Sequence, residues 1–156
     1  AEFGIKPFGI RAMDAMRLEK SYRLVGTELS IEYAALESGL HRFVHLNKGE
    51  FKGRQKLSQW QENGFTNTMV TLEVNDTTDA DAIGGNPIRL PDGSVIGRAT
   101  GGGYGFRLNK SLSLAMVRPE LAAVGTELMI DVLDQCLCAT VIEESPYDPE
   151  NQRLRA

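Results

Sequence analysis

Cysteine is scarce in this sequence, with Cys136 and Cys138 as the only two in 156 residues. Residues two apart in a strand point the same way but cannot comfortably close a disulfide, so no disulfide framework is expected. We interpret the pair as small buried residues on one face of a strand. The lack of further cysteine fits a reducing compartment, and the cytoplasm is the predicted location.

Long apolar runs and an excess of positive charge are also missing. No apolar run approaches the roughly 20 residues of a membrane-spanning helix. The opening AEFGIKPFG lacks the basic and apolar regions of a signal peptide. The 17 Lys and Arg residues against 21 Asp and Glu residues give a net charge of -4 and a pI of about 5.2. We therefore predict neither nucleic acid nor a membrane as a partner.

Histidine is equally rare, with two residues, and their placement argues against a metal site. His41 and His45 have the spacing of a helical zinc pair, which the two cysteines could complete. Residues 40–46, however, mix apolar and basic residues in rough alternation and predict a strand. Positions four apart in a strand lie about 13 Å from each other, too far for ligands of one zinc ion. No metal is predicted.

A glycine run at 101–105, followed by Asn109-Lys110-Ser111, has some features of a phosphate-binding loop. Such a loop needs glycine directly before the lysine and a helix directly after it, whereas here Asn109 holds that place and a strand is expected to follow. We interpret the run as a tight crossing between strands, where positive φ or close backbone approach requires glycine. No Ser-His-Asp order and no carboxylate pair in an apolar setting stands out, so no catalytic residue is assigned.

The stretch 7–22, PFGIRAMDAMRLEKSY, predicts one amphipathic helix that runs into a turn. The helix places Arg11, Asp14, Leu18 and Tyr22 on one face, if it holds that far. Much of its remaining surface is apolar and suited to burial. Little chain precedes the helix to cover this surface, so we expect that the sequence is the tail of something longer. We also expect self-association through this helix.

The rest of the chain divides near residue 64. Residues 51–63 predict a second helix, which Gly64 ends. Beyond it, short segments alternate apolar with polar residues, and Pro91-Asp92-Gly93 predicts a hairpin. Several short strands with no helix between them favour a small antiparallel barrel or sandwich. The alternating residues that should be buried are Val70, Leu72, Val74, Leu112, Leu114, Leu128, Ile130 and Val132. From the residues alone the chain is α+β, and its chemistry stays open.

Five segments in this order resemble the C-terminal portion of the aminomethyltransferase family. They are RAMDAMRLEKSYRLVGTELSIEYAALESGLHRFV, GEFKGRQKL, GSVIGRATGGGYGFRLNKSLSLAMV, GTELMIDV and SPYDPENQRLRA. The family includes the glycine cleavage T-protein and the folate-binding halves of dimethylglycine and sarcosine dehydrogenases and oxidases. The R-L-E-K-x-Y and Y-D-P elements are most similar to the dimethylglycine and sarcosine dehydrogenase branch. The resemblance implies that residues 1–64 end a mixed α/β folate-binding domain and that residues 65–156 form a C-terminal antiparallel β-barrel.

The resemblance also implies a reaction, in which a one-carbon unit passes from a small methylated amine to tetrahydrofolate. The cofactor is then tetrahydrofolate in the intact parent protein, with FAD in an upstream domain as a further option. The family's catalytic aspartate has no counterpart in this chain, and Asp14 belongs to a different motif. We therefore expect the chain alone to be inactive. The alternative is a stand-alone β-barrel that binds a ligand or a partner without catalysis.

Three residues carry over as candidates for folate binding. Tyr22 matches a family position where tyrosine contacts folate, although it could equally be a core residue that closes the helix end. Many T-proteins have an arginine where this sequence has Met13, and Arg11 lies two positions, or about 200°, away around a helix. Tyr104, in the glycine-rich run, could touch the folate-binding parts or pack between domains. Arg17 and Glu19 fit structural ion-pair or capping roles better.

Overall fold

The computed structural model describes residues 2–75 and 80–156. Both α-helices lie within residues 2–64, which we call the N-terminal half, and all the strands follow it. The helices are α1 (Ile10–Glu19), the 3-10 turn η1 (His41–Phe43), α2 (Arg54–Asn63) and the 3-10 turn η2 (Pro119–Leu121). The strands are β1 (Thr68–Val74), β2 (Pro87–Arg89), β3 (Val95–Gly105), β4 (Lys110–Val117), β5 (Glu127–Val132) and β6 (Gln135–Ile142). No described helix is long and apolar enough to cross a membrane.

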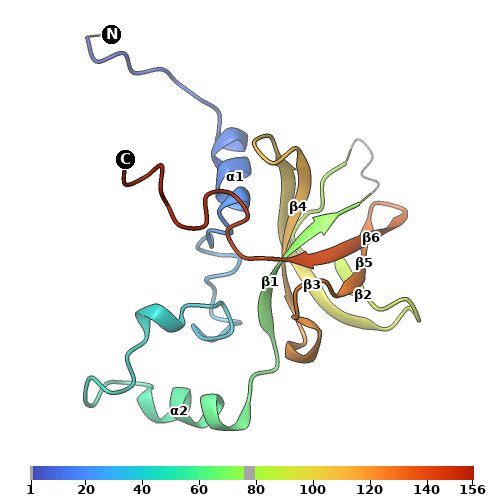
Figure 1. The fold of residues 1–156 in the computed structure, drawn as a ribbon. Coiled ribbons are helices and arrows are strands. Elements are labelled where there is room, and N and C mark those ends of the chain that lie inside the picture. Colours follow the sequence, from blue (N-terminus) through green and yellow to red (C-terminus); the bar gives the residue numbers. More distant parts are fainter. Residues whose placement is uncertain (1, 76–79) are drawn as a thin grey trace.

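The strands close into a barrel in the order β1-β4-β3-β2-β5-β6, and all six pairings are antiparallel. Figure 1 shows α1 and the C-terminal segment beside this barrel, with α2 at the far end of the N-terminal half. The predicted antiparallel barrel is therefore confirmed. So is the hairpin between β2 and β3, where Gly93 has a φ of 88° and the Leu90 N–H donates to the Ser94 carbonyl at 3.0 Å.

All eight residues predicted to be buried are buried, but they belong to two different cores. Leu112 and Leu114 lie outside the barrel, where they pack against Leu18 of α1. Their strand, β4, is buried on both faces, because Ala115 and Val117 point into the barrel. The period-two pattern thus located the buried face without showing that a helix covers it. The other six fill the barrel interior: Val70, Leu72, Val74, Leu128, Ile130 and Val132.

The prediction that the glycine run is a crossing between strands is wrong. The run forms the second half of the long strand β3. Glycine is needed here because α1 lies close to the backbone of β3, and none of these glycines has a positive φ. A Cβ at Gly103 would lie 3.1 Å from Leu18 Cδ1, and one at Gly105 would lie 3.0 Å from Glu19 Cγ. Larger side chains here would lift the last turn of α1 off the barrel. The run therefore positions α1.

Gly97 in β3 is packed even more tightly, and Gly97→Ala is expected to lower the free energy of unfolding by about 2–3 kcal/mol. The new Cβ would lie 2.2 Å from the Met116 carbonyl oxygen and 2.9 Å from Val117 Cα, so β4 itself would have to move. Gly103→Ala is the matched control, because its Cβ meets a flexible leucine methyl group; we expect a loss below about 1 kcal/mol. Urea unfolding measures both, and equal losses would contradict this account.

Both α-helices are shorter than predicted. In α1, Gly9 is the N-cap, and at the other end Ser21 has a φ of 52°, which turns the chain out of the helix. Tyr22 therefore lies beyond α1 and does not share its face with Arg11. In α2, Gly53 has a φ of 92°, which delays the start to Arg54, while Gly64 ends the helix as predicted.

Two further predictions are wrong. Residues 40–46 form no strand. The barrel is closed and offers no free edge, and local hydrogen bonds such as that from the Phe43 N–H to the Leu40 carbonyl produce η1 instead.

The two cysteines are not buried as predicted. Cys136 is exposed and Cys138 only half-buried, because Leu137 between them faces the barrel interior and the cysteines point outward. Within residues 2–75 and 80–156, no cluster of His, Cys, Asp or Glu has the geometry of a metal site.

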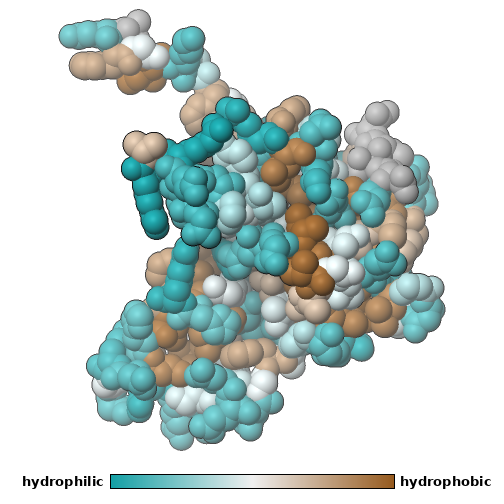
Figure 2. All heavy atoms as spheres, in the orientation of Figure 1, coloured by the Kyte–Doolittle hydropathy of each residue, from teal (hydrophilic) through white to brown (hydrophobic). Residues whose placement is uncertain are grey.

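The segment before α1 stands clear of the rest of the molecule (Figure 2). Phe3 is 81% exposed, and Ile5 and Phe8 are exposed to a similar degree. Met13 and Met16 on α1 are also exposed, so the predicted apolar surface is present. Self-association through it stays a prediction.

The C-terminal segment is fastened to the end of α1 (Figure 1). The Lys20 ammonium donates to the carbonyls of Tyr147 at 3.0 Å and Asp148 at 2.6 Å. The Ser145 hydroxyl donates to the Lys20 carbonyl at 2.7 Å, and the Tyr147 N–H donates to the Glu19 carbonyl. These contacts bring the tail within reach of the residues that follow α1.

Candidate functional site

We name three hollows after their central features. Two lie where the N-terminal half meets the barrel, and the third lies between the N-terminal half and the C-terminal segment. The α1 hollow, of about 520 Å³, lies between α1 and β3. The Arg23 hollow, of about 570 Å³, lies beside the chain that leaves α1 and includes η1. The Arg98 hollow, of about 620 Å³, lies between the 32–33 loop, residues 66–67 just before β1, and the strands β2, β3 and β4. All three have the volume of a small-molecule site.

The α1 hollow has the most apolar walls. Ile10 and Met13 of α1 form one side, and Leu24 and Ile83 form part of the rest; all four are exposed. Arg11 adds a positive charge at the rim. A flat ring with a polar edge suits such a surface, because its faces can lie on the apolar groups while an arginine binds the edge.

A buried ion pair fixes the geometry behind this hollow. Arg17 pairs with Asp14 one turn earlier in α1, and its Nη1 lies 3.5 Å from Glu28 Oε2. Glu28 is 0% exposed. It accepts hydrogen bonds from the Leu24 N–H at 2.8 Å and from the hydroxyls of Thr27 and Thr100. The carboxylate thus joins α1, the loop after it and β3, and it confirms Arg17 as a structural ion-pair residue.

The Glu28 carboxyl is held in its charged form. Burial by itself raises its pKa, but the hydrogen bonds from Thr100, Thr27 and the Leu24 N–H, together with the charge of Arg17, outweigh burial and leave the pKa below its ordinary value. This role is not predicted from the sequence, because Glu28 lies in a polar stretch after Gly26 that is typical of a surface segment.

A second buried carboxylate, Glu37, was also missed. It is 8% exposed and accepts hydrogen bonds from the Ala34 N–H at 2.8 Å, the Thr66 hydroxyl at 3.1 Å and the Asn67 N–H at 3.0 Å. The Met69 N–H also donates to its backbone carbonyl at 2.9 Å. Glu37 therefore holds the start of β1 against the N-terminal half.

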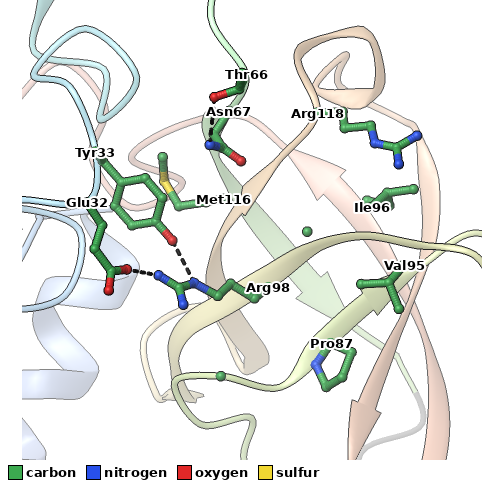
Figure 3. A pocket seen from close by; sticks show the side chains of 12 residues that line it. Glu32, Tyr33, Thr66, Asn67, Pro87, Val95, Ile96, Arg98, Met116 and Arg118 are labelled. Atoms are coloured by element: carbon green, nitrogen blue, oxygen red, sulfur yellow. Dashed lines mark hydrogen bonds and ion pairs between the residues drawn. The ribbon is translucent and has the colours of Figure 1, made fainter.

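The Arg98 hollow is a further junction between these two parts. Arg98 donates from Nε to the Tyr33 hydroxyl at 2.7 Å and forms an ion pair with Glu32. Figure 3 shows Arg98 reaching across to both residues, with Arg118 on the opposite side of the hollow. The Tyr33 hydroxyl and the Glu32 carboxylate raise the pKa of Arg98. The guanidinium is committed to the protein, so the interaction is structural.

The structure does not bring the three predicted folate-binding residues into one hollow. Arg11 lines the α1 hollow, and Tyr22, 43% exposed, lines the Arg23 hollow. Tyr104 lies near the end of β3, where its hydroxyl is 2.5 Å from Asn109 Oδ1 and its ring meets the Phe106 ring edge-on at 5.2 Å. Glu19 is buried and accepts the Arg107 N–H at 2.6 Å. Among the residues that the structure describes, it forms no ion pair and its side chain caps no helix.

Comparison with known proteins agrees with this architecture. A model for the glycine cleavage T-protein C-terminal barrel domain matches residues 67–148, and a model for the GCVT N-terminal domain matches residues 1–48. The chain therefore belongs to the glycine cleavage T-protein family, as the sequence resemblance indicated. The gap between the two matches contains residue 64, and the boundary placed there stays a prediction.

Its relatives include both dehydrogenases and transferases. The chain is 38% identical over 157 residues to the mitochondrial dimethylglycine dehydrogenase of Homo sapiens, which is 99% of this chain but 18% of that protein. It is 35% identical over 145 residues to the aminomethyltransferase of Synechococcus elongatus, covering 92% of this chain and 38% of that protein. The chain thus spans well under half the length of these relatives.

A solved structure shows the same fold. The glycine cleavage system aminomethyltransferase T from Bartonella henselae superposes with a TM-score of 0.82 at 21% sequence identity. The superposition covers 90% of this chain and 39% of that one. It extends beyond the barrel residues, so it includes the way in which part of the N-terminal half sits on the barrel.

Proposed function

We propose that this chain is the C-terminal portion of a longer enzyme that transfers a one-carbon unit from a small methylated amine to tetrahydrofolate. The observation that carries the proposal is the family membership of both halves of the chain, with relatives named dimethylglycine dehydrogenase and aminomethyltransferase. In the dehydrogenase branch, FAD in an upstream domain is part of the same proposal. A reducing location such as the cytoplasm, in which Cys136 and Cys138 stay free thiols, also remains a proposal.

Within that enzyme, the α1 hollow forms one wall of the folate site. Its residues fit one side of a planar ligand: the apolar side chains of Ile10, Met13 and Ile83 provide a surface for a ring, and the Arg11 guanidinium can bind a carboxylate or a polar ring edge. Tetrahydrofolate would supply the atom that accepts the one-carbon unit. This chain would bind and orient it, while the catalytic carboxylate would come from upstream.

The proposal is tested first in the genomic DNA that precedes the first codon. An open reading frame that continues upstream is expected, and a stop codon immediately before the first residue would contradict the proposal. The longer protein should bind tetrahydrofolate, and Arg11→Gln in it should weaken binding about tenfold, or about 1.4 kcal/mol. Lys52→Gln, an exposed residue far along the chain from this hollow, is the matched control and should bind normally. Equilibrium dialysis measures all three proteins.

The barrel interior does not support the alternative function, a stand-alone barrel that binds a ligand without catalysis. Its interior is filled with aliphatic side chains from all six strands, including Leu72, Ile88, Ile96, Ala115, Ile130 and Val141. A small barrel packed in this way leaves its binding to the outer surface and the loops. The α1 hollow and the Arg98 hollow lie on that outer surface, at the contact with the N-terminal half.

A further inference from the structure

We propose that the Arg23 hollow binds the carboxylate of a small planar aromatic acid. This inference does not rest on the proposed folate chemistry, because it concerns a different hollow and is tested on the chain alone. The hollow is lined by residues that follow α1, by η1 and by one residue of the C-terminal segment. The members used below are Tyr22, Arg23, Gly39, Arg42, Phe43 and Glu144.

The first observation is an unpaired donor. The Arg23 side chain is only 9% exposed. Its Nε donates to the Ser38 carbonyl at 2.8 Å, and its Nη1 donates to the Ser21 carbonyl at 3.1 Å and to Glu144. Among the described residues, its buried Nη2 has no acceptor. A buried guanidinium nitrogen without an acceptor is costly, so its retention points to a missing partner.

Gly39 makes room for this nitrogen. A Cβ at Gly39 would lie 2.3 Å from Arg23 Nη2, and Gly39 has a φ of 71° that also disfavours other residues. The guanidinium therefore lies against bare backbone in the lining of the hollow. Nη1 and Nη2 together form the edge of the guanidinium that binds a carboxylate through two parallel hydrogen bonds. At present Glu144 uses only one of these two nitrogens.

The second observation is the character of the surrounding walls. The Tyr22 ring is 43% exposed and the Phe43 ring 63% exposed, so two aromatic surfaces are open to a ligand. Arg42 lies 4.7 Å above the Phe43 ring, and Lys20 lies 5.9 Å from the Tyr22 ring. In a chain of net charge -4, this is a local excess of positive charge. Aromatic side chains with cations beside them favour binding of a flat ring that carries a negative charge.

Glu144 acts as an internal competitor for the same site. Its side chain is 55% exposed, and it comes from the C-terminal segment that is fastened to α1. An incoming carboxylate would meet it at Arg23 Nη1. Removing its charge should therefore leave Nη1 with only the Ser21 carbonyl as an acceptor and tighten ligand binding, whereas removing the charge of Arg42 should weaken ligand binding. These two opposite effects distinguish a carboxylate site from an apolar hollow.

The test titrates the chain with 2-naphthoate and its neutral isostere 2-naphthamide, followed by calorimetry or by chemical shifts of Tyr22 and Phe43. We expect saturable naphthoate binding with a Kd of about 1 mM and at least tenfold weaker naphthamide binding. Glu144→Gln should bind naphthoate about threefold more tightly and Arg42→Gln about threefold more weakly. Glu143→Gln and Arg155→Gln, exposed and outside the hollow, are the matched controls and should not change the affinity.

Several results would overturn the inference. Equal affinity for naphthoate and naphthamide would show that the hollow recognises only a ring. A peptide rich in aspartate that binds at least as tightly as naphthoate would show that the surface accepts acidic protein segments instead. Unchanged naphthoate affinity in both Glu144→Gln and Arg42→Gln would show that the ligand carboxylate does not bind in this hollow. Because Arg23 also holds two backbone carbonyls, Arg23→Lys is only a supporting variant, and the other two decide the outcome even if it fails to fold.

Discussion

Titration of this chain alone with tetrahydrofolate is expected to show weak binding or none, about a thousandfold below the affinity of the complete enzyme. The chain provides one wall, the α1 hollow, while the remaining contacts of a folate site would lie upstream. A partial site loses more than its share of the binding free energy, because the missing contacts remove favourable interactions while the entropy cost of binding stays. A loss of about 4 kcal/mol corresponds to the thousandfold reduction.

Calorimetry under reducing conditions provides the measurement, with assays for aminomethyltransferase and dehydrogenase turnover, which we expect to be absent. The informative variant is Tyr22→Ala, because Tyr22 lies in a different hollow from Arg11. Micromolar binding that disappears in Tyr22→Ala would show that the folate site is complete within this chain and centred on Tyr22. Arg11→Gln, measured in parallel, would then leave that binding unchanged.

Replacement of Glu28 by alanine is expected to lower the free energy of unfolding by about 4 kcal/mol. The carboxylate is fully buried and joins three segments through Arg17, Thr100 and the Leu24 N–H. Alanine would leave the Leu24 N–H without its acceptor, and Arg17 would keep only the partly exposed Asp14 as an ion-pair partner. The loss of the buried partner of Arg17 adds the largest cost. Chemical unfolding followed by circular dichroism measures the loss.

Glu28→Gln is the matched variant and should lose only about 1 kcal/mol. Its amide oxygen can accept from the Leu24 N–H, while its amide nitrogen can donate to the Thr100 hydroxyl. Thr100 Oγ1 can in turn donate to the Leu114 carbonyl, which lies 3.1 Å away. Only the charge that faces Arg17 is lost. If glutamine costs as much as alanine, the network depends on charge and not on hydrogen bonds.

The pH dependence follows from the lowered pKa of Glu28. A group with a lowered folded pKa stabilises the protein fully above its unfolded pKa, about 4.3 for glutamate, and loses that contribution as the pH falls through the folded pKa. The difference in stability between the unmodified chain and Glu28→Gln should therefore be constant near neutral pH. It should shrink as the pH falls below about 4. A difference that grows in acid would contradict the assigned charge.

The strand pattern was predictable because alternation is a local property. Val70, Leu72 and Val74 show which face is buried before any partner strand is known. The hairpin at Gly93 and the cap at Gly64 depend on φ values that only a few residues adopt readily, so they too could be predicted. The failure at residues 40–46 has the opposite cause: alternation there met no strand edge, and local hydrogen bonds decided the structure.

The candidate site was only partly predictable. The sequence predicts Arg11 and Tyr22 on one helix face, yet they line different hollows because the chain turns out of the helix at Ser21, one residue before Tyr22. The unpaired nitrogen of Arg23 depends on the neighbouring Gly39, sixteen positions away, and on Glu144, more than a hundred positions away. Contacts between residues so far apart in the chain produce no pattern that a short segment of sequence would show.

By itself, the sequence determined the antiparallel strands and the buried faces of β1, β4 and β5 and, through its resemblance, the barrel and the family. These depend on side-chain order along one segment, which periodicity and turn residues record directly. Only the tertiary structure decided that the glycines of β3 admit α1, that Glu28 is a buried acceptor, and that Arg23 keeps a nitrogen unpaired. The physical reason is that burial and hydrogen-bond partnership depend on segments far apart in the chain, and they exist only once those segments have packed together.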